Sequence, residues 1–271
     1  MPYKKIQKTI EKYKMFNKND KILVASSGGK DSQFLIFTLN QLGYKFDCVF
    51  VDLGITNFSK NSFEKVHDLT NKLKINTYKI DLKKLVGKSL QEIKTKKPYC
   101  SVCGNIKRYL INKFAYDNKY DVILTGHTID DALRVVLHGI LNWNIDYLPK
   151  VYPVSKKERT FVKKVKPLFF VWEDEIIKEV KKNNIPYLRE KCPLSTKAKT
   201  KEMDEIIEKI KEIKSREFLE LFLKGFLKKR KLFKIKEIEL NECKICGSLT
   251  TGEICSFCKL FNLKEPINLK I

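Results

Sequence analysis

The sequence predicts an α/β protein built on a doubly wound, mostly parallel sheet, with a helical extension and a small C-terminal zinc ribbon. Strand-like apolar runs alternate with helix-like amphipathic runs from residue 1 to about residue 190, and such alternation is typical of βαβ units. A glycine-rich turn joins the first expected strand to its helix, and paired CxxC motifs mark the last segment. We therefore expect a main domain over 1–198, a helical extension over 199–236 and a metal-binding ribbon over 237–271.

The expected elements follow one another in the order that a parallel sheet requires. A leading amphipathic helix over 4–16 precedes the first strand, 22–25, and the helix 34–42. Further strands are expected at 47–54, 75–82, 121–126 and 185–188, and further helices at 62–73, 104–118, 129–143 and 173–182. The segment 144–167 shows no regular pattern. Beyond residue 195, one long basic helix is expected over 201–233, with an apolar face made of Leu219, Leu221, Phe222 and Phe226.

Basic residues outnumber acidic ones along the whole chain. The 271 residues include 55 Lys and Arg against 32 Asp and Glu, which gives a net charge of +23. This excess predicts a polyanionic partner, most often nucleic acid, although a lysine-rich composition without any partner is the alternative. No apolar run approaches the ~20 residues of a membrane span, and the first residues contain no apolar stretch of signal-peptide type. We therefore expect a cytoplasmic protein with no membrane partner.

The turn at 25–32, Ala-Ser-Ser-Gly-Gly-Lys-Asp-Ser, is the strongest functional signal. An apolar strand enters it and an apolar-periodic helix leaves it. The adjacent glycines let the backbone approach a ligand closely, and the first N–H groups of the helix, with the Ser27 and Ser32 hydroxyls, form a cradle for oxyanions. The spacing matches neither the GxxxxGKS/T loop of NTPases nor the GxGxxG turn of dehydrogenases. It predicts a phosphate site of another kind.

Four cysteines in the last segment predict a structural zinc site. Cys243 and Cys246 form one CxxC pair, and Cys255 and Cys258 form a second. Two such turns present four thiolates that complete a tetrahedron around one Zn²⁺, which leaves no open position for a substrate.

A third CxxC pair, Cys100 and Cys103, has only two local thiols. Cys192 is the one cysteine left besides Cys48, whose apolar neighbours predict a buried side chain. Three thiolates on a four-iron cluster leave one iron free to hold an exogenous ligand such as hydrosulfide. The spacing leaves a CxxC redox pair, a persulfide carrier and a zinc-ligand set open as alternatives.

Five motifs occur in a characteristic order: SGGKDS, PYCSVCGNIKRYLIN, TGHTIDD, the lone CPLS cysteine and the terminal CxxC pairs. Together they resemble the tRNA 2-thiolation enzymes of the TtcA/TtuA group, a family of PP-loop ATP pyrophosphatases, over roughly residues 1–260. The residues of these motifs are most similar to those of the branch that makes 2-thiouridine. The resemblance implies an adenine nucleotide alpha-hydrolase-like fold in which ATP, cleaved to AMP and pyrophosphate, adenylylates the uridine C2 oxygen, which sulfur then displaces.

The resemblance also implies the site residues. Lys107 and Asp131 would be the catalytic pair, because an ammonium neutralises charge on phosphate or on the uracil oxygen and a carboxylate positions metal or substrate. A surface lysine and an acid favoured at a helix N-terminus are the plainer alternatives. Cys100, Cys103 and Cys192 would bind a 4Fe-4S cluster. ATP and its Mg²⁺ would be bound by Ala25, Ser27, Gly28, Gly29, Lys30, Asp31, Ser32, Leu53 and Gly126.

Two features depart from the family pattern. No cysteine precedes Cys48, so the N-terminal zinc finger usual in this branch is not found, and TGHTIDDAL stands where GHNLDDE is the familiar form. We expect an ATP-dependent tRNA sulfurtransferase that makes 2-thiouridine, forms a homodimer and takes its sulfur from sulfide or a ubiquitin-like thiocarboxylate carrier protein. The alternatives are 2-thiocytidine synthesis, a PP-loop amidating ligase acting on a small molecule, and a non-catalytic RNA-binding module.

Overall fold

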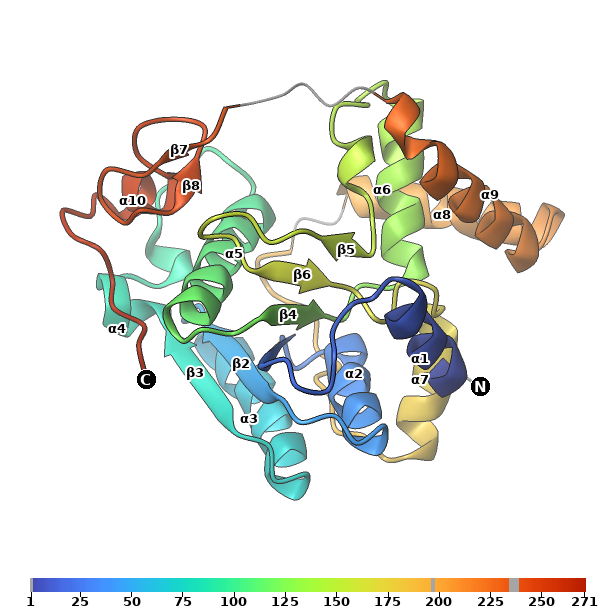
Figure 1. The fold of residues 1–271 in the computed structure, drawn as a ribbon, viewed down its shortest axis with the longest axis horizontal. Helices are drawn as coiled ribbons and strands as arrows, with labels where there is room; N and C mark the ends of the chain where they lie inside the picture. The colour runs from blue at the N-terminus through green and yellow to red at the C-terminus, as the bar shows by residue number, and fades with distance from the viewer. Residues whose placement is uncertain (1, 196–197, 234–238) are drawn as a thin grey trace.

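The computed structural model describes residues 2–195, 198–233 and 239–271. Its centre is a six-stranded sheet in the order β3-β2-β1-β4-β6-β5 (Figure 1). The strands are β1 (Ile22–Ser26), β2 (Asp47–Asp52), β3 (Thr77–Asp81), β4 (Val122–Thr125), β5 (Val154–Ser155) and β6 (Lys163–Val165). All pairs are parallel except β5 with β6. The predicted mostly parallel α/β fold is confirmed.

Helices cover both faces of this sheet. α1 (Pro2–Lys12), α2 (Lys30–Gln41), α3 (Thr56–Lys72) and α7 (Glu173–Lys182) share one apolar core, whereas α4 (Leu82–Val86), η1 (Leu90–Glu92) and α5 (Tyr99–Asp117) share the other. Strand side chains alternate between the two cores. In β1, Ile22 and Val24 belong to the first core and Leu23 to the second, as expected for a strand covered on both faces.

The helical extension differs from the single long helix that the sequence predicts. It consists of α8 (Ala198–Ile213), α9 (Arg216–Lys229) and the short η3 (Arg230–Leu232). Ser215 between the first two has a φ of 121°, which ends the α-helix. Leu219 and Phe226 are buried in one core with α6 (Ile129–Leu141), but Leu221 is 66% exposed, so its predicted place on the apolar face is wrong.

The predicted strand at 185–188 is also wrong, because these residues bind the glycine turn instead. The Leu188 N–H donates to the Gly28 carbonyl at 2.8 Å, and the Gln33 side-chain amide donates to the Pro186 carbonyl at 2.8 Å. Pro186 has no N–H with which to extend a sheet. Conversely, β5, β6 and η2 (Leu148–Lys150) lie in the segment for which the sequence predicts no regular element.

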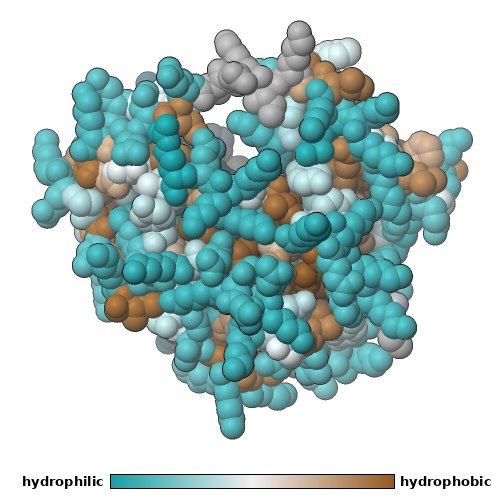
Figure 2. Space-filling view, viewed as in Figure 1, coloured by the Kyte–Doolittle hydropathy of each residue, from teal (hydrophilic) through white to brown (hydrophobic). Residues whose placement is uncertain are grey.

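The C-terminal segment is a small unit that packs against α5. It contains β7 (Asn241–Glu242), β8 (Leu249–Thr250) and α10 (Ser256–Phe261), and the Phe257 ring stacks on Tyr109 of α5 at a centroid distance of 4.0 Å. Hydrophilic side chains cover most of the molecular face in Figure 2. Among the described residues, none of the helices has the length and apolar character that crossing a membrane requires.

Candidate functional site: a phosphate turn beside two cysteine clusters

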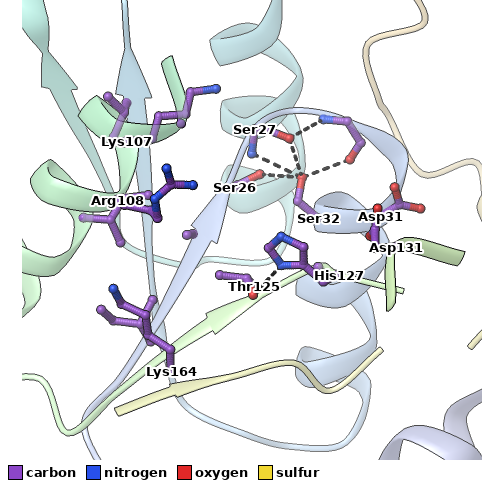
Figure 3. Close-up of a pocket in the computed structure, with 17 residues that line it drawn as sticks. Ser26, Ser27, Asp31, Ser32, Lys107, Arg108, Thr125, His127, Asp131 and Lys164 are labelled. Atoms are coloured by element: carbon purple, nitrogen blue, oxygen red, sulfur yellow. Dashed lines mark hydrogen bonds between the residues drawn. The ribbon is translucent and has the colours of Figure 1, made fainter. Parts of the chain in front are cut away.

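The Ser32 hydroxyl organises the glycine turn between β1 and α2 (Figure 3). Its Oγ accepts hydrogen bonds from the Ser27 N–H and the Ser26 hydroxyl, both at 3.2 Å, and donates to the Gly29 carbonyl at 3.0 Å. The turn ends at the N-terminus of α2, whose first N–H groups have no acceptor within the helix. This arrangement is typical of an anion site.

Two glycines allow the chain to pack tightly around this turn. Gly28 has a φ of +78°, and a Cβ there would lie 2.5 Å from the Ser62 carbonyl oxygen. Gly126 follows β4, and a Cβ there would lie 2.9 Å from the Ser32 backbone nitrogen. Any side chain at either position would therefore displace the turn from its neighbours.

A cavity of about 430 Å³ opens beside the turn, at the carboxyl ends of β1 and β4. Open α/β sheets bind their ligands at this edge. Lys107, Arg108 and Lys164 lie on one side of the cavity, whereas the serine turn, Asp31 and Asp131 lie on the other (Figure 3). A cationic wall thus faces a wall of hydroxyl groups and carboxylates.

Most of the predicted nucleotide residues line this cavity. They are Ala25, Ser27, Gly29, Asp31, Ser32 and Gly126, and the predicted catalytic residues Lys107 and Asp131 line it too. Gly28, Lys30 and Leu53 are not in the lining. The Lys30 ammonium lies 2.9 Å from Glu173, and the Leu53 carbonyl accepts a hydrogen bond from the Leu90 N–H.

Arg134 and Glu173 tie the cavity to the helices behind it. Arg134 donates to Asp131 at 2.9 Å and to Glu173 at 2.8 Å, and it also pairs with Asp204 of α8. Although burial opposes the shift, hydrogen bonds from Lys30 and Arg134 hold the pKa of Glu173 below its usual range. The orientation of Asp131 therefore depends on contacts from α6, α7 and α8.

Asp31 keeps one carboxylate oxygen without a partner. Its Oδ2 lies 3.1 Å from the Lys30 ammonium, whereas its Oδ1 is buried and accepts no hydrogen bond from the described residues. Burial raises the pKa of Asp31 to about 6, although Lys30 opposes this shift. A buried, unpaired carboxylate oxygen in a phosphate site has the chemistry of a hard-cation ligand.

Arg108, His127 and Lys164 also line the cavity, although none of them is among the predicted site residues. The His127 Nδ1 lies 2.9 Å from the Thr125 hydroxyl. Burial lowers the pKa of Lys164 to about 8, and the nearby Arg108 adds to the effect. The pair Lys163-Lys164 in an irregular segment is the only sequence signal for this lysine, because β6 itself is not predicted.

The structure brings Cys100, Cys103 and Cys192 to one place. The Cys100 Sγ lies 4.0 Å from the Leu194 carbonyl oxygen, so the first turn of α5 touches the segment that follows Cys192. Burial raises the pKa of Cys103, Lys107 opposes the shift, and the neighbouring Cys192 and Cys100 add to it. The three thiols therefore lie near one another at the start of α5.

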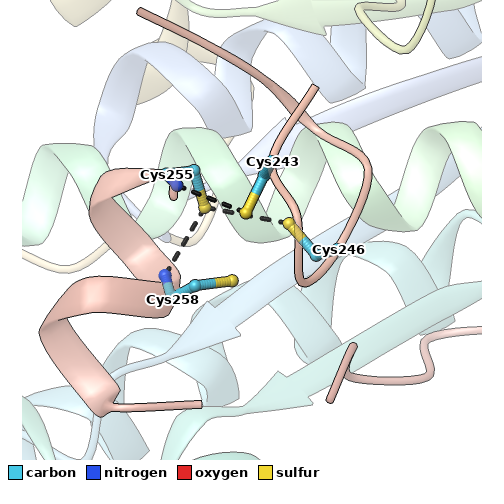
Figure 4. Close-up of side chains that lie close together, drawn as sticks. All are labelled: Cys243, Cys246, Cys255 and Cys258. Carbon is cyan, nitrogen blue, oxygen red and sulfur yellow. Dashed lines mark hydrogen bonds between the residues drawn. The ribbon is translucent and has the colours of Figure 1, made fainter. Parts of the chain in front are cut away.

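The four C-terminal cysteines form a compact group (Figure 4). The thiol sulfurs of Cys243, Cys246, Cys255 and Cys258 all lie within 4.8 Å of one another, a spacing that the described residues show for no other group of metal-ligating side chains. The backbone N–H groups of Cys255 and Cys258 donate to the sulfurs of Cys243 and Cys255. Such a closed set of four thiols matches a structural metal site.

Comparisons with known proteins agree with this geometry. Residues 2–198 match the PP-loop domain family. The chain is 41% identical over 270 residues to the tRNA-5-methyluridine(54) 2-sulfurtransferase of Pyrococcus horikoshii, covering 99% of this chain and 87% of that protein. It is 40% identical over 260 residues to the protein of the same name from Thermotoga maritima, covering 94% and 85%.

A solved structure shows the same likeness over the whole chain. The U34-tRNA thiolase NcsA from Methanococcus maripaludis, determined with its 4Fe-4S cluster, superposes with a TM-score of 0.83 at 25% identity and covers 100% of this chain and 89% of that one. The predicted resemblance is confirmed. The chain belongs to the PP-loop family of tRNA 2-thiolation sulfurtransferases.

Proposed function

We propose that this protein is an ATP-dependent tRNA sulfurtransferase that makes 2-thiouridine. The observation that carries the proposal is the placement of Cys103 and Lys107 four residues apart on α5. Residues so spaced share one face of a helix, and Lys107 lies close enough to Cys103 to affect its pKa. The same helix therefore presents a thiol to the cysteine trio and an ammonium to the nucleotide cavity.

The glycine turn binds the phosphates of ATP in this proposal. The first N–H groups of α2 and the hydroxyls of Ser27 and Ser32 contact the phosphate oxygens. The Oδ1 of Asp31 would hold the Mg²⁺ that accompanies ATP, since among the described residues it is the only acidic oxygen in the turn that is buried without a partner. Val51, rather than Leu53, lines the cavity near the end of β2.

Lys107 and Asp131 serve the chemical step from opposite walls of the cavity. The C2 oxygen of uridine attacks the α-phosphorus of ATP, and the bond to pyrophosphate breaks. The Lys107 ammonium stabilises the charge that develops on the phosphate or on the uracil ring. Asp131, oriented by Arg134, positions the reacting base or the metal. Sulfur then forms a bond to C2, the C2–O bond breaks, and AMP leaves.

Cys100, Cys103 and Cys192 fit a 4Fe-4S cluster better than a single ion. They converge, yet their sulfurs do not form a group as compact as the C-terminal four. Cys100, Cys103 and Cys192 would hold such a cluster, which would supply an iron without a protein ligand and so able to bind sulfide. Cys103 and Cys192 are partly buried, and Cys100 is exposed.

The remaining parts of the proposal concern partners and the C-terminal unit. Zn²⁺ binds Cys243, Cys246, Cys255 and Cys258 and stabilises a ribbon whose only regular elements among the described residues are β7, β8 and α10.

The sulfur donor is sulfide or a ubiquitin-like thiocarboxylate carrier, and the protein works as a homodimer. The three parts 1–198, 199–236 and 237–271 act as catalytic domain, extension and ribbon.

The names of the relatives support a uridine derivative as the target. Those from P. horikoshii and T. maritima are named for 5-methyluridine 54, and the NcsA structure is named for U34. The higher identity to the first two favours 5-methyluridine 54. Mass spectrometry of tRNA nucleosides after reaction distinguishes 2-thio-5-methyluridine from 2-thiouridine and 2-thiocytidine.

Anaerobic reconstitution tests the whole proposal. The purified protein is incubated with ATP, tRNA and sulfide, and iron, AMP, pyrophosphate and thiolated nucleosides are measured. We expect Cys192→Ala to lose iron and thiolation, whereas Cys48→Ala, which changes a buried cysteine of the opposite core, keeps both. Full activity of Cys192→Ala without iron would refute the cluster mechanism. Thiolation without formation of AMP would refute the proposal that the glycine turn binds ATP for adenylylation of the uridine.

A further inference from the structure

A second, larger cavity adjoins the nucleotide site. This groove, of about 820 Å³, runs between α5 and the C-terminal ribbon and is lined by the connector 94–97, one face of α5, Phe161 of the loop before β6, and ribbon residues 248–251, 255–257 and 259–260. The motifs and the proposed mechanism give it no role. Its walls are held in place by the stacked rings of Tyr109 and Phe257, one from each side.

The charge of this groove has a single sign. Among its lining residues six are Lys or Arg and none is Asp or Glu, although the chain as a whole has 32 acids against 55 basic residues. The six are Lys94, Lys96, Lys97, Arg108, Lys164 and Lys259. A groove that excludes carboxylates while collecting cations favours a ligand with several negative charges.

These six cations lack close acidic partners among the described residues, although Glu253 lies near enough to Lys259 for the lysine to help lower its pKa. Within residues 2–195, 198–233 and 239–271, none of them forms a salt bridge. Arg108 donates instead to the neutral Asn105 side chain at 2.6 Å. Lys164 is half-buried, and both its burial and repulsion by the nearby Arg108 lower the pKa of its ammonium group. An incoming anion would relieve this repulsion.

The groove and the nucleotide cavity meet at two residues. Arg108 of α5 and Lys164 of β6 line both. A ligand lying in the groove therefore reaches the wall that carries Lys107, opposite the glycine turn (Figure 3). A nucleic-acid strand bound in the groove can therefore place one of its bases in the nucleotide cavity.

We propose that this groove binds the phosphodiester backbone of the RNA strand that carries the reacting nucleotide, and that Arg108 and Lys164 hold the phosphate beside the reacting base. The inference rests on the proposed function, because it takes the substrate to be tRNA. Lys94, Lys96, Lys97 and Lys259 then contact successive phosphates away from the cavity. Phosphate contacts of this kind supply most of the affinity of such complexes.

An RNA strand fits these observations better than the tail of a carrier protein. A thiocarboxylate tail has one terminal charge, which needs one or two cations at the cavity. The groove instead distributes its cations from the connector 94–97 across to Lys259 on α10. Charges spread along a path match a polymer with one negative charge per residue.

Salt-dependent tRNA binding tests the proposal. The groove variant Lys94→Gln/Lys96→Gln/Lys97→Gln/Lys259→Gln is compared with Lys4→Gln/Lys8→Gln/Lys12→Gln/Lys18→Gln. The second variant removes four lysines that are likewise exposed from α1 and the loop after it, on the side of the sheet away from the ribbon (Figure 1). Both variants carry the same net charge. Zinc content and urea unfolding verify that both are folded.

We expect the groove variant to lose on the order of 10- to 100-fold in tRNA affinity at about 150 mM KCl, with the slope of log K against log salt shallower by about 3. The α1 variant should keep a slope close to that of the wild type. Equal slopes for the two variants would overturn the proposal. So would a groove variant that binds tRNA normally but loses transfer from a carrier protein while keeping transfer from sulfide, because the groove would then bind the carrier tail. If the wild-type protein fails to bind tRNA at all, the proposed function itself is wrong.

Discussion

The Lys30 ammonium lies 2.9 Å from a carboxylate oxygen of Glu173. The lysine of the glycine turn therefore reaches the N-terminus of α7 and does not line the cavity. Glu173 accepts at the same time from Arg134 at 2.8 Å. One carboxylate thus restrains the phosphate turn and, through Arg134, the candidate catalytic Asp131.

Glu173→Gln should weaken both the fold and the site. The substitution leaves Lys30 and Arg134, each about a quarter exposed, without their shared anion. We expect a loss of about 1–3 kcal/mol in the free energy of unfolding, since solvent screens part of the buried-pair penalty. Urea unfolding measures this loss. Glu64→Gln, an exposed carboxylate of α3 with no ion pair among the described residues, is the control and should change stability by less than about 0.5 kcal/mol.

Gly28→Ala should abolish ATP binding for a steric reason. Its φ is +78°, and the new Cβ would lie 2.5 Å from the Ser62 carbonyl oxygen. Gly43→Ala is the matched control, because Gly43 has a φ of +74° with no atom within 4 Å of the added carbon. The control should cost about 1–2 kcal/mol from backbone strain alone. Gly28→Ala should cost more and also lose the nucleotide, as measured by calorimetric titration with ATP. Equal stability and ATP affinity of the two variants would show that the close approach is unimportant.

Local patterns are enough to predict much of this fold and of its candidate site. The glycine turn, the three CxxC motifs and the strand-helix alternation are contiguous in sequence, so their residues come together through short-range geometry. Lys164, Arg134 and Glu173 are different. Arg134 pairs with Glu173 thirty-nine residues away, and Lys164 lies near Arg108 of α5. No local pattern predicts such pairs. The false strand at 185–188 has the same origin, since its hydrogen bonds go to Gly28 and Gln33.

Asp131→Asn should impair the chemical step, whereas Asp204→Asn should weaken only the packing of the helical extension on α6. Both acids pair with Arg134, but only Asp131 lines the cavity. The Asp131 carboxylate accepts a hydrogen bond from the Thr128 N–H at 2.9 Å, and the side-chain oxygen of an asparagine at this position can accept the same bond. We therefore expect Asp131→Asn to lower kcat by on the order of 100-fold with little change in unfolding. Asp204→Asn should keep kcat within about threefold and lower the free energy of unfolding by about 1 kcal/mol. Loss of kcat in both variants would mean that Asp131 acts only through Arg134.

Lys164 should make stability depend on pH in the alkaline range. Its pKa is about 8 in the folded protein against an ordinary 10.5, so between these values the unfolded chain binds more protons and stability rises with pH. Below pH 8, Lys164 is charged in both the folded and the unfolded protein, so burial of its charge lowers the free energy of unfolding by the full amount. Lys164→Met should therefore raise the free energy of unfolding at pH 7, on the order of 2 kcal/mol after allowance for partial exposure. This advantage should shrink between pH 8 and 10.5.

Lys163→Met is the control for this titration. Lys163 is the preceding residue of β6, and its ammonium donates to the Lys14 carbonyl on the other face of the sheet at 2.9 Å. Its replacement should cost about 1 kcal/mol, since one hydrogen bond is lost. Urea unfolding of both variants between pH 7 and 10.5 gives the comparison. Parallel pH profiles for the two variants would contradict a depressed pKa at Lys164. Because Lys164 lies where the groove meets the nucleotide cavity, a tRNA phosphate beside it should stabilise its existing charge and reduce the advantage of Lys164→Met at pH 7.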